Sequence, residues 1–521
     1  MATVATASPA SASAADVSRR RLSTFEQIML SFYWFAESMH WAAILIVALP
    51  SQVAFMAGDD FKGRGVGLIL AVGALISMVA APFFGAYSDH IRTRWGRRRP
   101  FIVIGVLMNI VGLVALAYIP REGDSSSLLP YMIAFMWVEF WNNVATAPYS
   151  ALIPDMVLPE QRGSASGWMG LMRMLGNFLG GAAGLLFGVF AGIMLMFGTS
   201  GSQAGIVGIY WFVIIVNFIG MLGTVIFIKE PKVEPPTTPL NWGNLVGIMT
   251  AFAFAALGAI LLNALGFFGV DVGPVGGIVL TLGSLPLGVI IVFGLAALRG
   301  QFARLYAATR SYFSRHSDFV WVLLTRLLIT LGVYTVQEFL QYYLGDVIRN
   351  FTLFGSVVTD RPETAVSFFL ITLLVGAIIS AYFGGALSDR YGRKLMVYLS
   401  GALQAAVVFL LLPIHDFTAV VLLGVVFGLG YGAYQSVDWA LATDVLPSED
   451  YAKDMGVWHV ADVLPQMIGT PFAGFFLDTF QRIGRSPGVN MPNLGYTVIF
   501  GMAIVYLFLG TVFVKQIKKV R

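Results

Sequence analysis

Acids, bases and amides occur inside long apolar runs of this chain, at positions three or four residues apart. Such spacing places side chains on one face of a helix. An ionisable group at membrane depth is costly, and it usually marks a pathway for a solute or an ion. Hydrogen-bonding solutes and protons are therefore the species that these faces could handle. The sets in the first part of the chain are Glu37, His40 and Trp41, then Glu139, Asn142 and Asn143, and then Arg173 and Asn177.

Two later apolar runs carry similar polar faces. A hydroxyl-rich solute needs converging amides and carboxylates for its hydrogen bonds, and an aromatic face suits the apolar side of a sugar ring. We therefore expect a site for a sugar or glycoside, although an amphipathic metabolite would suit the same groups. The expected substrate-binding residues are Trp41, Trp141, Asn142, Asn143, Tyr334, Gln337, Gln341, Tyr434, Gln435, Asp438 and Trp439.

The acids inside these runs could also bind and release protons. Burial favours the neutral acid and a nearby cation favours the carboxylate, so a pair that forms and separates could exchange a proton near neutral pH. We expect Glu139 to be the principal proton carrier and Arg173 to be its partner. A static structural bridge between the two is the alternative. Further candidates for the proton pathway are Glu37, His40, Glu338 and Asp462.

Nothing in the sequence predicts a metal site, a cofactor or an enzyme. The chain has no cysteine, and its five histidines lack the HxxxH and HxH spacings of metal ligands. Thiol chemistry and metal binding are therefore not expected. We find no phosphate-binding Walker loop, no HExxH motif and no GxSxG motif with a plausible set of partners.

Composition and hydropathy place the polar faces in membrane-spanning helices. Of the 521 residues, 57% are hydrophobic and 12% are charged, whereas soluble domains carry about 25% charged residues. Apolar runs of roughly 20 residues, enough to cross a hydrocarbon core of about 30 Å, recur along the chain. The sequence predicts an all-α membrane protein with about 14 transmembrane helices. We expect spans near 27–53, 66–88, 100–119, 129–157, 165–198 and 206–228, an inserted pair near 242–268 and 274–298, and spans near 319–345, 363–388, 395–414, 418–446, 455–480 and 494–515.

These spans group into two bundles joined by a linker. The first residues are rich in alanine and serine and have no apolar core, so we expect a disordered tail there rather than a signal peptide. The expected parts are a tail at 1–24, a six-helix bundle at 25–228, a linker with the inserted helices and a basic segment at 229–317, a second six-helix bundle at 318–516 and a tail at 517–521.

A short basic loop occurs twice, at Gly85–Pro100 and at Gly384–Lys394. Each copy ends one apolar span and begins another. Duplicated helical halves around a central site are the architecture of secondary transporters. The glycines permit close helix contact, and the aspartates can cap a helix or pair with arginines to latch one side of a carrier. Arg326 and Asp155 lie near the ends of their spans, and we expect them to act as gate or snorkelling residues. The expected gating residues of the loops are Gly85, Asp89, Arg97, Arg98, Gly384, Asp389, Arg390 and Arg393.

The loop resembles the Gly-x-x-x-Asp-Arg-x-Gly-Arg signature of the major facilitator superfamily. Its longer ending, Trp95–Pro100, is similar to that of the glycoside–pentoside–hexuronide:cation symporters and the sucrose/proton symporters. Glu139–Asn143 and Gly176–Gly180 resemble the fourth and fifth helices of sucrose carriers, except that the fourth-helix acid is Glu rather than Asp. This resemblance implies the major facilitator fold and alternating access, with helices one, four, seven and ten lining the cavity. It also implies proton-coupled symport of a sugar or glycoside.

Other transport functions remain as alternatives. Sodium symporters of the melibiose type place acids on the second helix as well as the fourth, and here residues 66–88 contain no acid before Asp89. A proton-coupled exporter of a drug-like or amphipathic metabolite is the main rival function. Exporters of the superfamily carry a Gly-Pro-x-x-Gly-Gly element on the fifth helix, and residues 165–198 contain no proline. A channel would instead show a repeated ring of pore-lining residues.

The distribution of basic residues predicts the orientation in the membrane. Arg92–Arg99, Arg299–Arg315 and Lys515–Arg521 all fall in loops and ends on one side. Cytoplasmic loops carry such an excess of lysine and arginine, so we expect both termini in the cytoplasm and the protein in the plasma membrane as a multi-pass monomer. Its expected partners are a small-molecule substrate, protons and the lipid bilayer, without nucleic acid.

Overall fold

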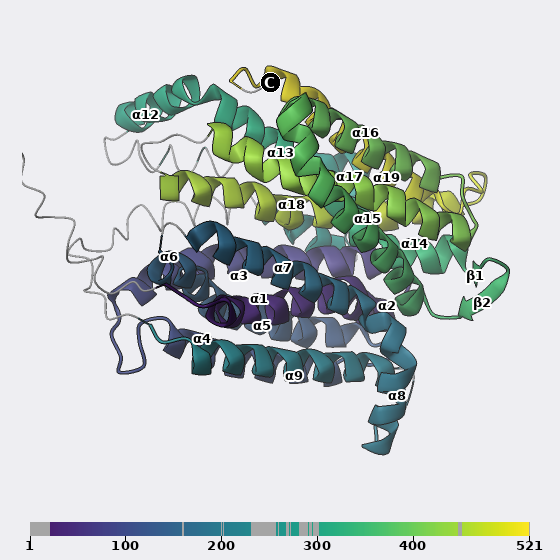
Figure 1. The fold of residues 1–521 in the computed structure, drawn as a ribbon. Helices are drawn as coiled ribbons and strands as arrows, with labels where there is room; N and C mark the ends of the chain where they lie inside the picture. The colour runs from purple at the N-terminus through teal and green to yellow at the C-terminus, as the bar shows by residue number, and fades with distance from the viewer. Residues whose placement is uncertain are drawn as a thin grey trace, which may run out of the picture.

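The chain folds into two bundles of long helices that lie side by side. Residues 24–227 form the purple to teal bundle and residues 317–516 the green to yellow one (Figure 1). The computed structural model describes residues 21–158, 161–199, 201, 203–230, 257–258, 260–266, 270, 272–280, 290, 294, 302–445 and 451–519, and for some helical residues in these ranges it describes the backbone alone.

The first bundle begins at a capping box. The Ser23 hydroxyl accepts a hydrogen bond from the Glu26 N–H at 3.3 Å, and the Glu26 carboxylate accepts one from the Ser23 N–H at 2.9 Å. This exchange satisfies two donors that the helix start would leave unpaired. The elements are α1 (Thr24–Ala43), the π-helix η1 (Ile44–Ala48), α2 (Leu49–Ala57), α3 (Lys62–His90), α4 (Arg99–Tyr118), η2 (Ser125–Ser127), α5 (Leu128–Ser150), α6 (Leu152–Met156), α7 (Arg162–Gly181), η4 (Ala182–Leu186), α8 (Phe187–Met196) and α9 (Ala204–Phe227).

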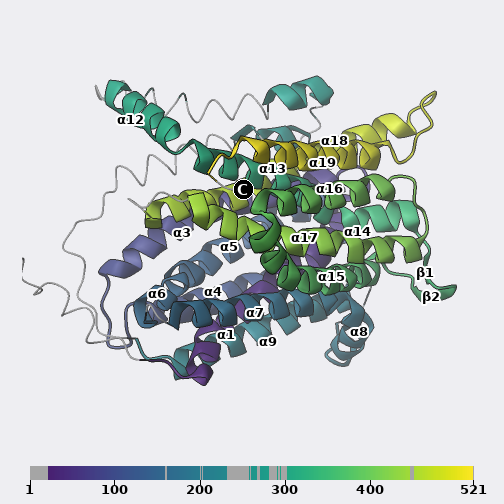
Figure 2. The ribbon, with the colours of Figure 1, turned by 45° about the horizontal axis from the view of Figure 1, so that its top comes forward.

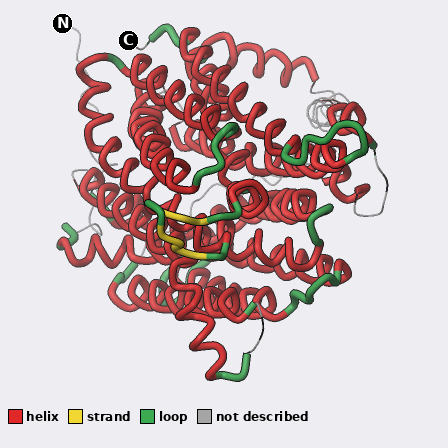
Figure 3. The backbone as a smooth tube through the Cα atoms, turned by 90° about the vertical axis from the view of Figure 1, so that its right-hand side faces the viewer, coloured by secondary structure: helices red, strands yellow, loops and turns green. Residues whose placement is uncertain are grey.

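The second bundle follows α12 (Phe302–Arg315), which projects beyond both bundles in two views (Figures 1 and 2). A short antiparallel hairpin of β1 (Phe351–Leu353) and β2 (Ser356–Thr359) lies at the opposite end of the molecule and faces the viewer in Figure 3. The remaining elements are α13 (Ser317–Gln337), α14 (Leu340–Tyr343), the π-helix η5 (Leu344–Ile348), α15 (Pro362–Tyr391), α16 (Arg393–Leu411), α17 (Phe417–Val445), α18 (Tyr451–Arg485), α19 (Leu494–Phe513) and η6 (Val514–Gln516).

Every span expected outside the inserted pair contains a helix. Ten helical segments of the described chain are long and apolar enough to cross a membrane, and α5 and α18 occupy the two other expected spans. The prediction of an all-α membrane protein is therefore confirmed. The hairpin, with the only strands among the described residues, was not predicted.

Most of the inserted region lies outside the described residues, as do residues 1–20, so the predicted helix pair and the disordered tail stay predictions. Residues 260–266 and 273–280 are helical where they are described. Asn263 Nδ2 donates to the Pro471 carbonyl of α18 at 3.1 Å, which places this part of the insert against the second bundle.

The two halves repeat a structural detail beyond their basic loops. The first span of each half contains a π-helix, which begins at Ile44 in the first half and at Leu344 in the second. These positions are 300 residues apart, as are Asp89 and Asp389 of the loops. Because π-helices are rare, their recurrence in register supports the prediction of a duplicated architecture.

The two ends of the molecule differ in how the bundles meet. We call the end with the basic loop at 91–98 the loop end, and the end with β1 and β2 the hairpin end. At the hairpin end one apolar core includes Val53 and Val66 of the first bundle together with Phe339 and Phe475 of the second. A separate apolar cluster, built from the first bundle alone, lies toward the loop end. The shared core shows that the halves are packed together at the hairpin end.

Candidate functional site

The polar faces of α1, α5 and α7 meet inside the first bundle. Glu37 of α1 interacts electrostatically with Arg173 of α7, and Trp41 and Asn142 hydrogen-bond to the Glu37 side chain. The Arg173 guanidinium also lies 5.1 Å from the ring centroid of Trp34. Three helices thus contribute an acid, a base, an amide and two indole rings to one cluster.

A second carboxylate adjoins this cluster. Glu139 of α5 is close enough to Glu37 for the two acids to interact electrostatically. Asn143 Nδ2 donates to the Glu139 carbonyl at 2.9 Å and to its Oε2 at 3.5 Å, while the Ser77 hydroxyl of α3 donates to Asn143 Oδ1 at 3.2 Å. We call Glu37, Glu139 and Arg173 the charged triad.

His40 is fully buried beside the triad and stacks on Trp41 with 4.6 Å between ring centroids. No described group hydrogen-bonds to either of its ring nitrogens. The spacing of Glu37 and His40 would allow a hydrogen bond within α1, but the structure contains none.

Trp141 is separated from the cluster by the geometry of α5. At 100° per residue it projects about 160° away from Glu139, onto the face where it packs against Trp137 and Phe140 with centroid distances of 5.7 and 5.3 Å. The structure therefore brings Trp41 to the triad but not Trp141.

The second bundle has a buried ion pair of its own. Arg326 of α13 pairs with Asp438 of α17, both side chains are buried, and the Tyr434 hydroxyl donates to Asp438 Oδ1 at 3.1 Å. Gln435 donates instead to the Tyr431 hydroxyl at 2.8 Å. The sequence predicted that Asp438 binds substrate and that Arg326 acts as a gate or snorkelling residue. In the structure the two side chains form one ion pair. A signal for this pairing was present, because both charges fall inside apolar helices.

The other substrate-binding residues expected in the second bundle lie away from this ion pair, or their side chains are not among the described ones. The Gln341 amide is hydrogen-bonded to the Ser51 hydroxyl of the first bundle at 2.6 Å, so it belongs to the contact between halves. Tyr334 and Gln337 are partly buried on α13. The side chains of Trp439, Asp462 and Asp389 lie outside the described residues.

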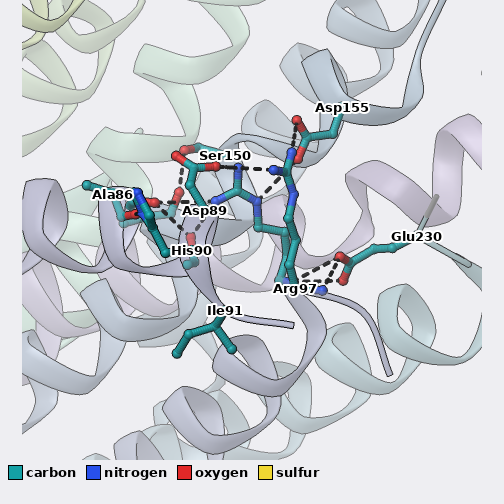
Figure 4. A network of polar contacts seen from close by, with 12 residues as sticks. Ala86, Asp89, His90, Ile91, Arg97, Ser150, Asp155 and Glu230 are labelled. Carbon is teal, nitrogen blue, oxygen red and sulfur yellow. Dashed lines mark hydrogen bonds and ion pairs between the residues drawn. The ribbon is translucent and has the colours of Figure 1, made fainter. Parts of the chain in front are cut away.

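The gating residues of the first loop form a charged network (Figure 4). Arg98 contacts Asp89 at 2.6 Å and Asp155 at 3.2 Å, and Arg97 contacts Asp155 at 2.5 Å. Arg98 Nη1 also donates to the Gly85 carbonyl at 3.3 Å. All these residues belong to the first bundle, so the network here braces one half rather than joining the two.

Glu230 completes this network, and the sequence did not single it out. Its carboxylate accepts hydrogen bonds from the backbone N–H groups of Arg97, Arg98 and Arg99 at 2.8, 3.0 and 2.7 Å. It therefore caps the N-terminus of α4. Gly96, with φ of +113°, leaves the space that the carboxylate fills, since a Cβ there would lie 2.7 Å from Glu230 Oε1.

Residues of the second copy of the loop also have described contacts. Arg393 donates to the Ser388 hydroxyl at 3.1 Å, and the Arg390 guanidinium lies 5.4 Å from the Tyr391 ring centroid. Gly384 packs against Ala433 of α17, as expected for a close helix contact.

Polar contacts join the two bundles at the hairpin end. The Asp478 carboxylate of α18 accepts from the backbone N–H groups of Gly63 and Arg64 at 3.1 and 2.7 Å. Lys62 pairs with Asp346 at 2.8 Å. Two further contacts are Ser51 with Glu363 at 2.8 Å, and Thr364 with the Gly184 carbonyl at 2.9 Å.

Two family models match the chain, one in each half. The model described as MFS/sugar transport protein matches residues 63–266, and that described as Major Facilitator Superfamily matches residues 339–519. The two matches together place the chain in the major facilitator superfamily. The predicted fold and family are thereby confirmed.

Curated relatives match over a shorter stretch. The sucrose transport protein SUC3 of Arabidopsis thaliana is 30% identical over 128 residues, and SUT4 of Oryza sativa subsp. indica is 32% identical over 134 residues. Solute carrier family 45 member 3 of Macaca fascicularis is 32% identical over 124 residues. Each match covers 22% of this chain and 22% of the relative's length.

Solved structures match over nearly the whole chain. A peptide transporter POT in complex with sulfate has a TM-score of 0.62 at 17% identity, covering 96% of this chain and 97% of its own. A bacterial homologue of the human lysosomal transporter Spinster, in an inward-facing and occupied conformation, has a TM-score of 0.62 at 14% identity, covering 95% of this chain and 96% of its own. These similarities establish the shared fold.

Proposed function

We propose that this transporter carries a sugar or glycoside together with protons, by alternating access between its two halves. The observation that carries the proposal is the charged triad, surrounded by Asn142, Trp34 and Trp41 in the half that matches the sugar-transport family model. Similarity to sucrose transport proteins supports the substrate class.

The triad provides the chemistry of proton coupling. Glu37 and Glu139 adjoin each other, and Arg173 is the one cation of the triad, so ionisation of both acids leaves one negative charge uncompensated at membrane depth, which is costly. In this conformation Arg173 interacts with Glu37, and the proton resides on Glu139. Release of that proton creates a second carboxylate that competes for Arg173. The pairing of Arg173 with Glu139 that the sequence predicts is then a later step of the cycle.

The groups around the triad suit a sugar. Asn142 and Arg173 can bond to hydroxyl groups, and the Trp34 and Trp41 rings offer apolar faces to a pyranose ring. Because substrate and proton would contact the same groups, binding of one alters the charge that the other meets. This linkage is the physical basis of symport.

The bundle contacts support an assignment of the direction in which the site opens. We assign the basic loop end to the cytoplasm by the excess of arginine and lysine there. Packing at the hairpin end then closes the outside, and the structure corresponds to an inward-facing carrier. The similarity to a Spinster homologue in an inward-facing conformation is in line with this assignment.

The substrate class is tested by a thermal-shift screen of purified protein against sucrose, phenyl glucosides, organic acids and lipophilic cations. We expect a sugar or glycoside to raise the unfolding temperature, and Trp41→Phe to weaken that shift. Trp141→Phe is the matched control, because Trp141 packs on the opposite face of α5. Stabilisation by lipophilic cations alone would favour the exporter instead and refute the sugar assignment.

A further inference from the structure

One buried acid of the second bundle takes no part in the charged triad. Glu338 lies at the break between α13 and α14, directly after the last residue of α13. Its side chain is almost completely buried, with 1% of its surface exposed. No described group hydrogen-bonds to either carboxylate oxygen.

A comparison with Asp478 shows why this arrangement requires explanation. Asp478 is buried to a similar degree at 3% exposure, but its carboxylate receives two backbone hydrogen bonds from the start of α3. The backbone donors and the positive helix end offset part of the cost of burying an ionised carboxylate there. Glu338 has no such compensation, and a buried, unpaired charge costs several kcal/mol. The Glu338 carboxyl is therefore neutral in this conformation.

The residues that follow Glu338 lie at the contact between the two bundles. Phe339 packs near Gly474 at the place where α18 meets Gly63 of α3. Gln341 contacts Ser51, and the Tyr342 hydroxyl donates to the Pro50 carbonyl at 2.8 Å. The first bundle thus covers the chain around Glu338, and separation of the bundles at the hairpin end would uncover it.

Charged groups on the elements packed around this break are occupied by other partners. Lys62 pairs with Asp346 and Asp59, and Glu363 accepts from Ser51. Asp478 is held by α3, as described above. Arg326, deeper in α13, pairs with Asp438. None of these groups supplies a charge to Glu338.

We infer that Glu338 is a second proton-binding site of the transporter, which must take up a proton before the hairpin end can close. In the open state the Glu338 carboxyl is exposed to the outside solution, and the pH of that solution determines whether it is ionised or protonated. Closure buries it, and only the protonated form is buried at low cost. The cycle then carries a proton in each half, one on the charged triad and one on Glu338. This inference deepens the proposed symport and shares with it the assignment of the hairpin end to the outside.

The inference is tested by measuring closure directly, without a substrate. The chain has no cysteine, so cysteines introduced at the exposed positions Glu122 and Pro487, one in each bundle at the hairpin end, can be spin-labelled uniquely. Double electron–electron resonance on the purified full-length protein then gives the closed and open populations as a function of pH. We expect the closed-to-open ratio to rise by up to about tenfold per pH unit on acidification, the limit for one proton.

Substitutions identify the side chain that is responsible for this pH dependence. Glu338→Gln, which keeps the shape without the charge, should stay closed at every pH, and Asp478→Asn should lower the closed population because the contact with α3 is weakened. Glu139→Gln should retain the pH dependence, so a failure of the triad hypothesis is distinguishable from a failure of this one. A Glu338→Gln protein with the wild-type pH dependence, or a wild type whose closure does not vary with pH, would overturn the inference.

Discussion

Glu230 shows how one side chain can organise the basic loop of the first half. It receives hydrogen bonds from three consecutive backbone N–H groups at the start of α4. Those groups are donors that a helix leaves without internal partners, and the negative charge also suits the positive end of the helix. The loop network with Asp89 and Asp155 is built on this fixed backbone.

Loss of this cap should destabilise the first bundle. We expect Glu230→Ala to lower the free energy of unfolding by about 2 kcal/mol, near the upper range for helix caps. Glu230→Gln should cost less, because an amide oxygen still accepts while the charge is lost. Thermal unfolding in detergent measures both, and equal unfolding temperatures for wild type and Glu230→Ala would show that the cap contributes nothing.

Asp59 gives the stability of the first bundle a dependence on pH at the hairpin end. A hydrogen bond and ion pair with Lys62, at 2.9 Å, hold the pKa of this loop aspartate below its ordinary value of 3.8. A depressed pKa contributes stability that is present above the ordinary value and is lost as the pH falls through the lower folded value. Asp59→Asn should therefore be less stable than wild type at neutral pH. The difference in unfolding temperature should disappear in strong acid, and a difference that persists there would contradict the assignment.

Single residues of the triad could be predicted, but their partners could not. Helical spacing alone identified Glu37, Glu139 and Asn142, because positions three and four apart share a face. Which helix each face meets depends on tertiary packing. For that reason Arg326 and Asp438 were predicted in separate roles, although they form one ion pair.

At the scale of elements, glycines set how closely the helices of the two halves approach. A Cβ added at Gly474 of α18 would lie 2.1 Å from the Gly63 carbonyl oxygen of α3, and one added at Gly184 would lie 2.1 Å from the Glu363 carbonyl oxygen of α15. Both contacts are backbone against backbone, so neither can yield by a side-chain rotation. Closure of the hairpin end therefore needs glycine at these positions.

Gly474→Ala should keep the hairpin end from closing. The measurement is labelling of a cysteine introduced as Ser51→Cys, at a position buried between the bundles, with a membrane-impermeant maleimide. We expect labelling to be several-fold faster in the Gly474→Ala background. Gly501→Ala is the control, because nothing lies within 4 Å of a Cβ there. Equal labelling rates for Ser51→Cys with and without Gly474→Ala would show that the α3–α18 contact does not close the hairpin end.

Long helices were predictable, and the interruptions within them were not. Apolar length defines a span such as α4 or α9, because the bilayer requires every backbone group to be bonded within the segment. The π-helices at Ile44 and Leu344 and the break at Glu338 depend on how the halves pack. The π-helix at Ile44 lies in a uniformly apolar run, and the polar residues Gln337, Glu338 and Gln341 would also suit one face of an unbroken helix, so the sequence does not distinguish these interruptions from a regular span.

For the whole molecule, the two contacts at the hairpin end are related by the duplication. In one, α3 of the first half meets α18 of the second. In the other, α15 of the second half, which corresponds to α3, meets η4 of the first. A pair of matched contacts lets the halves rock about the central site as nearly rigid bodies. In the alternating access that we propose, the charged triad would then meet one side of the membrane at a time.

We propose that the charged triad couples a proton gradient to sugar transport. The measurement that tests it most directly is accumulation, in proteoliposomes, of the labelled glycoside that best stabilises the protein, driven by an imposed proton gradient. Wild type should accumulate the glycoside and lose it when a protonophore is added. Glu139→Gln should still exchange glycoside across the membrane but accumulate none, because its side chain cannot release a proton. Accumulation by Glu139→Gln, or accumulation by wild type that follows a sodium gradient at constant pH, would contradict the account.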